Sequence, residues 1–145
     1  MARSNAIRLG HVNLEVTDLK TARRFYDRFF PVLGFSLIRP VDRFWVGYRS
    51  GHTAIWLTAT QPSRVVRRAP HVPIDGNQDP ISDHLGFRAP SVRRVLEVER
   101  SLRRLGLRPV YSTERQRTKG PAWYTSNAWR DPDNNVLEVY AVTRR

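Results

Sequence analysis

Apolar and polar residues alternate between positions 8 and 17, which is the pattern of a strand with one buried face. The apolar side consists of Val12, Leu14 and Val16. The other side is polar and consists of His11, Asn13 and Glu15. The spacing then becomes helical, with large apolar side chains at Ala22, Phe25, Tyr26, Phe29 and Phe30. Thr17 or Asp18 is expected to cap this helix, which ends between Pro31 and Gly34.

Three short apolar segments follow, at about residues 35–39, 44–48 and 53–59, and turn residues separate them. Residues 7–60 therefore read as a module made of a strand, a helix and three strands. Residues 61–80 are rich in Pro, Arg, Gly and Asn, and this composition predicts a linker or surface loop.

The same order of elements recurs after the linker. Residues 83–89 repeat the pattern of residues 10–16, with His84 in the place of His11, about 73 residues later (84 − 11). Ser91 is expected to cap a second helix that ends at Gly106, and strands are expected near 108–113, 122–129 and 136–142. The sequence thus predicts one α+β domain, residues 1–145, in which a second βαβββ module spans about 81–143.

Strand alternation places three polar side chains on corresponding faces of the two modules. His11, His84 and Glu138 all point away from the apolar positions that face the helices. If the mixed sheets of the modules curl around a central cleft, these side chains meet in it. Two imidazoles and one carboxylate form a facial metal site with open positions, which suits Fe, Mn, Zn, Ni or Co. The alternative for each residue is structural: a histidine bonded to the backbone, or a glutamate paired with one of many arginines.

Four segments resemble the vicinal oxygen chelate superfamily, which includes glyoxalase I, bleomycin-resistance proteins, fosfomycin-resistance enzymes and extradiol dioxygenases. They are residues 11–19, residues 24–26 with 33–35, residues 84–87, and residues 130–138, where Asn134 replaces the usual Gly of an Asp-Pro-Asp-Gly-Asn turn. The resemblance implies paired βαβββ modules around a cleft, with metal ligands at His11, His84 and Glu138. Trp56 stands where glyoxalase I-like members carry a fourth, carboxylate ligand, which argues against glyoxalase I activity.

Further residues are candidates for the wall of the cleft. Asn13, Trp45, Trp56 and Trp123 are expected to bind substrate, although ordinary core packing is the alternative for the tryptophans. Candidates for proton transfer or hydrogen bonding to a bound oxygen are Glu15, Tyr124 and Tyr140.

The composition of the chain limits the classes of binding partner that are expected. The net charge is +12, but the arginines are dispersed in pairs along the chain, so a solvated surface is favoured over a nucleic-acid site. Arg115, Arg117 and Lys119 lie together in a predicted loop, where a solvated basic surface is the default and steering of an anionic small-molecule substrate is the alternative. The chain has no cysteine, no membrane-spanning apolar run and no secretory signal, so we expect a cytoplasmic location and no membrane partner. Members of the superfamily often form dimers, and a homodimer, with or without exchange of modules, is expected.

These features predict a metal-dependent enzyme acting on a small molecule that chelates a divalent ion through adjacent oxygens. Lyase, transferase and dioxygenase chemistry all remain open. The alternative is a metal-free protein that binds or sequesters a small molecule, as bleomycin-resistance proteins do.

Overall fold

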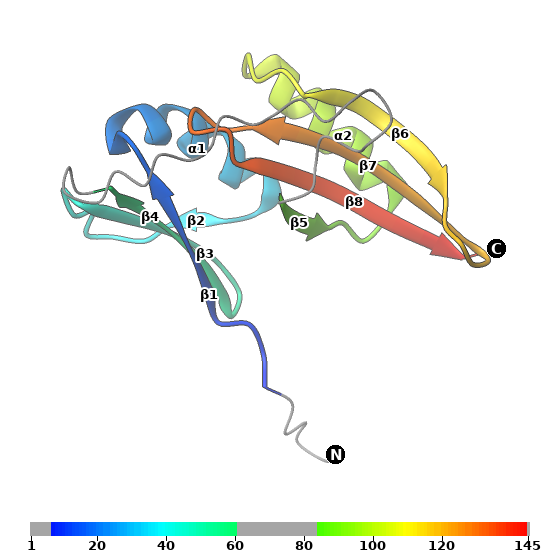
Figure 1. Cartoon of the computed structure of the whole chain (residues 1–145), viewed down its shortest axis with the longest axis horizontal. Coiled ribbons are helices and arrows are strands. Elements are labelled where there is room, and N and C mark those ends of the chain that lie inside the picture. The colour runs from blue at the N-terminus through cyan, green and yellow to red at the C-terminus, as the bar shows by residue number, and fades with distance from the viewer. Residues whose placement is uncertain (1–6, 61–83, 145) are drawn as a thin grey trace.

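A computed structural model describes residues 7–60 and 84–144, which fold into two modules of the same topology (Figure 1). The first module contains β1 (His11–Val16), α1 (Leu19–Leu33), β2 (Ser36–Leu37), β3 (Trp45–Ser50) and β4 (Thr53–Ala59). The second contains β5 (His84–Arg88), α2 (Val92–Arg104), β6 (Tyr111–Arg117), β7 (Ala122–Arg130) and β8 (Val136–Arg144). The predicted α+β class and the two βαβββ modules are confirmed; the predicted linker at 61–80 lies outside the described residues.

Each module forms a four-stranded mixed sheet, and the two sheets have equivalent strand orders, β1-β4-β3-β2 and β5-β8-β7-β6. The first strand of each module pairs in parallel with the last one, and the remaining pairs are antiparallel. Because β1 and β5 are edge strands beside β4 and β8, His11 and His84 occupy equivalent places in their sheets.

Local sequence signals explain where the helices begin and end. The Asp18 carboxylate accepts a 2.7 Å hydrogen bond from the Thr21 amide at the start of α1, so Asp18 is the cap. Ser91 caps α2 in the same way, accepting from the Arg94 amide. Gly34 has a φ of 89°, a left-handed conformation that ends α1.

The strand limits differ from the predicted ones in two places. Only Ser36–Leu37 of the segment 35–39 pairs as a strand, and Pro40, which has no N–H to donate to a ladder, follows soon after it. The strand expected near 108–113 begins later, at Tyr111, because Pro109 has no N–H to donate to a ladder. A register irregularity between Tyr111 and Glu114 then leads into a pairing that reaches Arg117.

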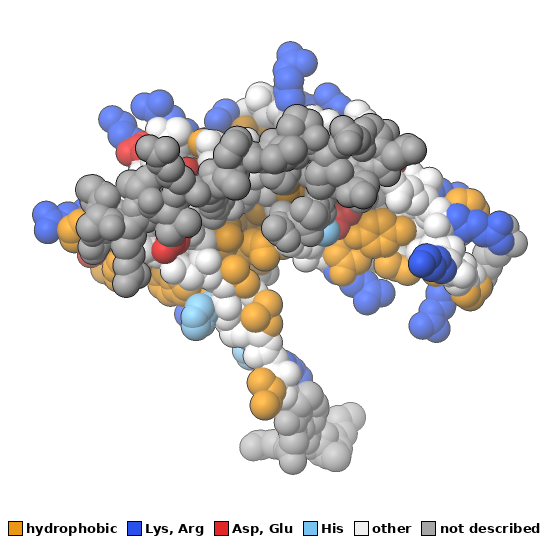
Figure 2. Space-filling model, viewed as in Figure 1, with side chains coloured by type: hydrophobic (Ala, Val, Ile, Leu, Met, Phe, Trp, Pro, Cys, Tyr) orange, Lys and Arg blue, Asp and Glu red, His pale blue; other side chains and the backbone are white. Residues whose placement is uncertain are grey.

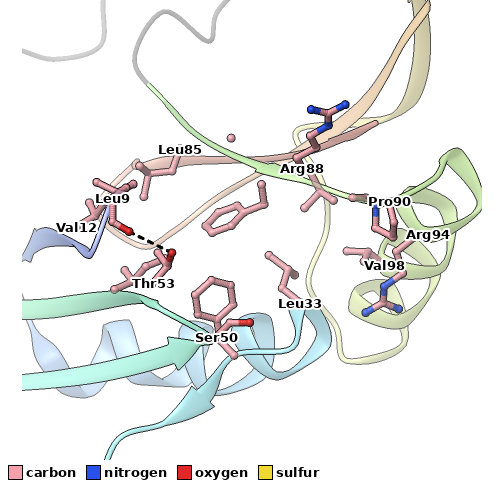
Figure 3. A pocket seen from close by; sticks show the side chains of 16 residues that line it. Leu9, Val12, Leu33, Ser50, Thr53, Leu85, Arg88, Pro90, Arg94 and Val98 are labelled. Atoms are coloured by element: carbon pink, nitrogen blue, oxygen red, sulfur yellow. Dashed lines mark hydrogen bonds between the residues drawn. The ribbon is translucent and has the colours of Figure 1, made fainter. Parts of the chain in front are cut away.

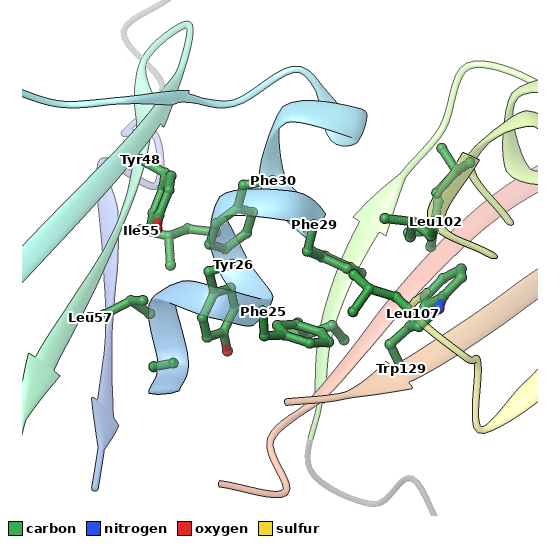
Figure 4. Packing of buried hydrophobic residues seen from close by; sticks show 14 of the residues in the cluster. Phe25, Tyr26, Phe29, Phe30, Tyr48, Ile55, Leu57, Leu102, Leu107 and Trp129 are labelled. Atoms are coloured by element: carbon green, nitrogen blue, oxygen red, sulfur yellow. The ribbon is translucent and has the colours of Figure 1, made fainter. Parts of the chain in front are cut away.

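The hydrophobic core runs through both modules, with α1 between them (Figure 4). Phe30 packs against Tyr48 of the first sheet, with 4.8 Å between the ring centroids. Phe29 packs against Trp129 of the second sheet, edge to face at 5.7 Å. Since one helix contributes rings to both sheets, the modules share a core and hold each other in place.

Each sheet has one face covered by helices and one face without helix cover. Leu57 and Leu137 belong to the covered faces and are fully buried. The neighbouring strand positions point the other way, as the pairing registers of β1, β4, β5 and β8 require. These two uncovered faces carry the predicted ligands.

The positive charge is dispersed in the described part of the chain. Figure 2 shows Lys and Arg side chains at several separate places on one face of the molecule rather than in one patch. No helix among residues 7–60 and 84–144 is long and apolar enough to cross a membrane.

Candidate functional site

His84 and Glu138 lie side by side on the uncovered face of the second sheet. Nε2 of His84 is 3.1 Å from Oε2 of Glu138. Glu138 is a charged residue in an apolar strand, and its side chain is nevertheless buried. Gly86 lies opposite Glu138 in the β5–β8 register. A Cβ atom on Gly86 would be 3.2 Å from the Tyr140 ring and 3.7 Å from Oε2 of Glu138, so glycine leaves the space that these side chains fill.

Tyr124 completes the surroundings of the carboxylate. Its hydroxyl donates a 2.7 Å hydrogen bond to Oε2 of Glu138, and its ring stacks on that of Tyr140 at 5.0 Å. Burial, followed by the hydrogen bond and charge of Glu138, raises the pKa of Tyr124 well above its usual value. The phenol therefore keeps its proton at neutral pH and remains a hydrogen-bond donor.

A pocket of about 360 Å³ opens on the uncovered face of the first sheet. It is lined by His11, Asn13, Trp45, Trp56 and Thr58, all from the first module. The Thr58 hydroxyl donates a 2.7 Å hydrogen bond to Oδ1 of Asn13. The rings of Trp45 and Trp56 meet edge to face at 5.1 Å. An imidazole, an amide and two indoles are thus gathered in one depression.

The structure brings together two of the three predicted metal ligands. The His84–Glu138 pair belongs to the second sheet, and His11 belongs to the pocket of the first sheet. Within residues 7–60 and 84–144, no three His, Asp or Glu side chains of one chain are grouped closely enough to hold a metal ion. The donor set of the pair fits a divalent ion, since imidazole and carboxylate are both common ligands, but the pair alone leaves the site one residue short.

Two other candidates lie away from these clusters. Glu15 is on the same face as His11 but four residues along β1, about 13 Å at the rise of an extended strand. Trp123 alternates with Tyr124 along β7 and so faces the opposite side of the sheet, where the Arg115 guanidinium lies 4.3 Å from the centroid of its ring. Trp123 therefore does not share a face with Glu138, contrary to the expected placement in a common cleft.

A second cavity, of about 390 Å³, lies at the seam between the modules (Figure 3). Its wall is mainly apolar and includes Leu33 and Ile55 of the first module and Leu85 and Val98 of the second. None of the predicted site residues lines it.

The sequence patterns did not identify one residue that shapes the pocket of the first sheet. Gly47 is buried in the middle of β3, opposite Trp56 in the β3–β4 register. A Cβ atom there would be 2.3 Å from Cζ3 of Trp56, far inside contact distance. The available signal was a glycine within a strand, which often marks a close approach of another group.

Sequence comparison assigns most of the chain to one family model. The model described as Glyoxalase/Bleomycin resistance protein/Dioxygenase superfamily matches residues 8–139. No curated protein matches the chain significantly.

Several solved structures share the fold over nearly their whole length. A lactoylglutathione lyase from Agrobacterium tumefaciens is 21% identical, with 96% of each chain covered and a TM-score of 0.62. A glyoxalase/bleomycin resistance protein/dioxygenase from Alicyclobacillus acidocaldarius is 18% identical over 97% of this chain and 94% of that chain, with a TM-score of 0.63. A glyoxalase/bleomycin resistance protein from Albidiferax ferrireducens is 21% identical over 92% of this chain and 98% of that chain, with a TM-score of 0.62. At these identities the likeness concerns the fold alone.

Proposed function

Because the chain belongs to the Glyoxalase/Bleomycin resistance protein/Dioxygenase superfamily, we propose that it is a metal-dependent enzyme acting on a small molecule with adjacent oxygens. The 3.1 Å approach of His84 to Glu138 carries this proposal. A carboxylate buried in an apolar strand is costly unless it is paired, and here it faces an imidazole and a phenol rather than a permanent cation. That combination suits a ligand pair.

We assign the third ligand position to His11 of a second copy of the chain. His11 and the His84–Glu138 pair lie on two different uncovered faces, and the described residues of one chain form no three-ligand group. In a two-fold dimer, the first sheet of each copy would cover the second sheet of the other, and two equivalent sites would form. Exposed apolar side chains on these faces, Trp45 and Val142, favour such burial.

The bound ion would supply Lewis acidity to a substrate held through two adjacent oxygens. The residues of the chain then have distinct tasks. His11, His84 and Glu138 would hold the ion. Tyr124 orients the Glu138 carboxylate and, as a protonated phenol, is placed to donate a hydrogen bond near a substrate oxygen. Asn13 and the two indoles would contact the substrate from the other sheet.

The position of Trp56 separates this site from a glyoxalase I centre. Trp56 lines the pocket beside His11 with an indole that has no ligand atom. A fourth ligand, the carboxylate of glyoxalase I-like members, is therefore absent from that place, and the reaction is proposed to be of the lyase, transferase or dioxygenase type without the proton shuttle that such a carboxylate provides.

Metal binding by single variants tests the proposal. Isothermal titration with Mn(II) or Ni(II) is expected to show affinity losses of at least about tenfold in His11→Ala, His84→Ala and Glu138→Gln. His52→Ala is the matched control, because His52 is exposed in the turn between β3 and β4. Equal binding by the wild type and His84→Ala would overturn the proposal.

The aromatic pocket supports a second candidate, a metal-free protein that binds a small molecule. Two indoles meeting edge to face could hold a ligand ring without an ion. Ligand binding that persists in chelator, together with metal affinity unchanged in all three ligand variants, would favour this candidate over the enzyme.

A further inference from the structure

The Trp56 indole lies directly over the backbone of Gly47. Three of its ring atoms, Cζ3, Cε3 and Cη2, lie 2.3, 2.5 and 2.8 Å from the position that a Cβ atom on Gly47 would occupy. Real Cβ atoms do not approach other atoms this closely, so any other residue at this position would displace the ring. Gly47 is buried and is not among the glycines with a positive φ, so glycine is needed there for the space that it leaves to the indole and not for its backbone conformation.

Trp45 forms the second wall of this depression. It is two residues from Gly47 on the same face of β3, and its ring meets that of Trp56 at an interplanar angle of 78°. Within one chain Trp45 is 41% exposed and Trp56 is half-buried, so both rings keep surface for a ligand held between this face and the facing sheet of the second copy. Two indoles at this angle let a flat ring stack on one of them while it touches the other.

Polar side chains on the same face of the sheet indicate the rest of the ligand. Asn13 is paired with Trp56 in the β1–β4 register, and its Oδ1 already accepts from Thr58, so its NH₂ group is the part directed to other partners. Arg49 is paired with Ala54, which is paired with His11, and therefore lies on the same uncovered face one row away. Among the described residues Arg49 is exposed and makes no ion pair.

We propose that this face recognises a planar aromatic acid, with its ring against Trp56 and its carboxylate toward Arg49. Gly47 acts as the positioning residue, because it fixes the height of the indole above the sheet. The proposal deepens the proposed function and rests on it in one respect: the same pocket contains His11, so the ring-bearing molecule would be the one that reaches the metal site. Binding of the ring itself requires no metal.

A matched pair of ligands tests the ring specificity in the presence of chelator. Naphthalene-2-carboxylate is planar, and decahydronaphthalene-2-carboxylate has the same carbon skeleton and acid group without the aromatic system. Isothermal titration of the full-length protein is expected to show a preference of about tenfold for the planar acid. Trp56→Ala is expected to remove this preference, and Arg49→Gln is expected to weaken both acids by the same factor.

The role of Gly47 is tested separately by the ligand preference of a Gly47→Ala variant. Gly47→Ala is expected to reduce the preference for the planar acid while the binding of the saturated acid changes little. Gly120→Ala is the control, because a Cβ atom there would meet nothing closer than 3.9 Å. Circular dichroism establishes whether each variant is folded; if Gly47→Ala does not fold, the Trp56→Ala result decides.

Three outcomes overturn the inference: no binding of either acid, equal affinity of the wild type for both, or a preference that survives in Trp56→Ala. Failure here is separable from failure of the proposed function, since metal titration of His84→Ala involves the opposite sheet. A protein that binds metal without ring preference refutes the aromatic acid alone. A protein that prefers the planar acid in chelator but has no metal affinity refutes the metal site alone.

Discussion

The Tyr26 hydroxyl donates a 2.7 Å hydrogen bond to Oδ2 of Asp131, and this bond joins α1 of the first module to the β7–β8 turn of the second. Asp131 also accepts hydrogen bonds from the amides of Asp133 and Asn135, so the turn is organised around its buried carboxylate. β8 leaves this turn and carries Glu138. The helix of one module therefore helps to position Glu138, the proposed metal ligand, in the other.

Tyr26→Phe is expected to destabilise the protein by about 1–3 kcal/mol, because it removes a buried donor from a charged acceptor. Urea denaturation measures the change in the free energy of unfolding. Tyr140→Phe is a suitable control, since no hydrogen bond of the Tyr140 hydroxyl is present among the described residues. Equal stability of Tyr26→Phe and the wild type would show that the bond does not tie the modules.

Stability is also expected to fall above about pH 10, the ordinary pKa of tyrosine. Burial and the Asp131 carboxylate raise the pKa of Tyr26 in the folded state. The unfolded chain then releases a proton that the folded chain retains, so rising pH favours unfolding. Urea denaturation at pH 8 and pH 11 should show a smaller pH-dependent loss in Tyr26→Phe than in the wild type; an equal loss in both would contradict this cause.

Asn134 adopts a left-handed conformation with a φ of 65° in the turn before β8. Asn134→Gly should leave the thermal stability unchanged or slightly raised, since glycine occupies this region without strain. Asn134→Val should lower stability by about 1–2 kcal/mol, because a β-branched residue is strained there. A Val variant as stable as the Gly variant would mean that the turn does not require this conformation.

Tyr124→Phe is expected to lower the affinity for Mn(II) by about 10–100-fold, as loss of a hydrogen bond to a ligating side chain commonly does. The reason is the 2.7 Å bond from its hydroxyl to Glu138, which orients the carboxylate. Tyr140→Phe keeps the stacked ring pair and should bind the ion as the wild type does. Indistinguishable affinities of the two variants would remove Tyr124 from the site.

Most of the fold could be predicted from the sequence because its signals are local. The alternation of apolar and polar residues predicted β1 and β5. The helix ends were predictable because Asp18 and Ser91 cap helices with side-chain hydrogen bonds and Gly34 adopts a left-handed conformation. The strand expected near 108–113 begins only at Tyr111, after Pro109, whose missing N–H removes one donor from the ladder.

The candidate site was predictable only in part, because the placement of one sheet against another depends on contacts between residues that are far apart in the sequence. The repeat predicts the order of the elements, and the structure adds the parallel pairing of β5 with β8, which places His84 beside Glu138. The alternation of apolar and polar residues predicts on which face of its sheet each candidate ligand lies. It does not predict which two sheets face each other. The position of His11 relative to the pair depends on how modules, and copies of the chain, are arranged. The cytoplasmic location and the homodimer stay predictions.

In the proposed dimer, each metal site forms from His11 of one copy and the His84–Glu138 pair of the other. Co-expression of His11→Ala and Glu138→Gln chains with different affinity tags allows the mixed dimer to be purified. That dimer contains one intact site and one doubly altered site. Titration with Mn(II) is expected to give about half of the wild-type stoichiometry at wild-type affinity, while each variant alone shows strongly reduced binding. A mixed dimer that binds Mn(II) no better than the single variants would show that the two copies do not share the site.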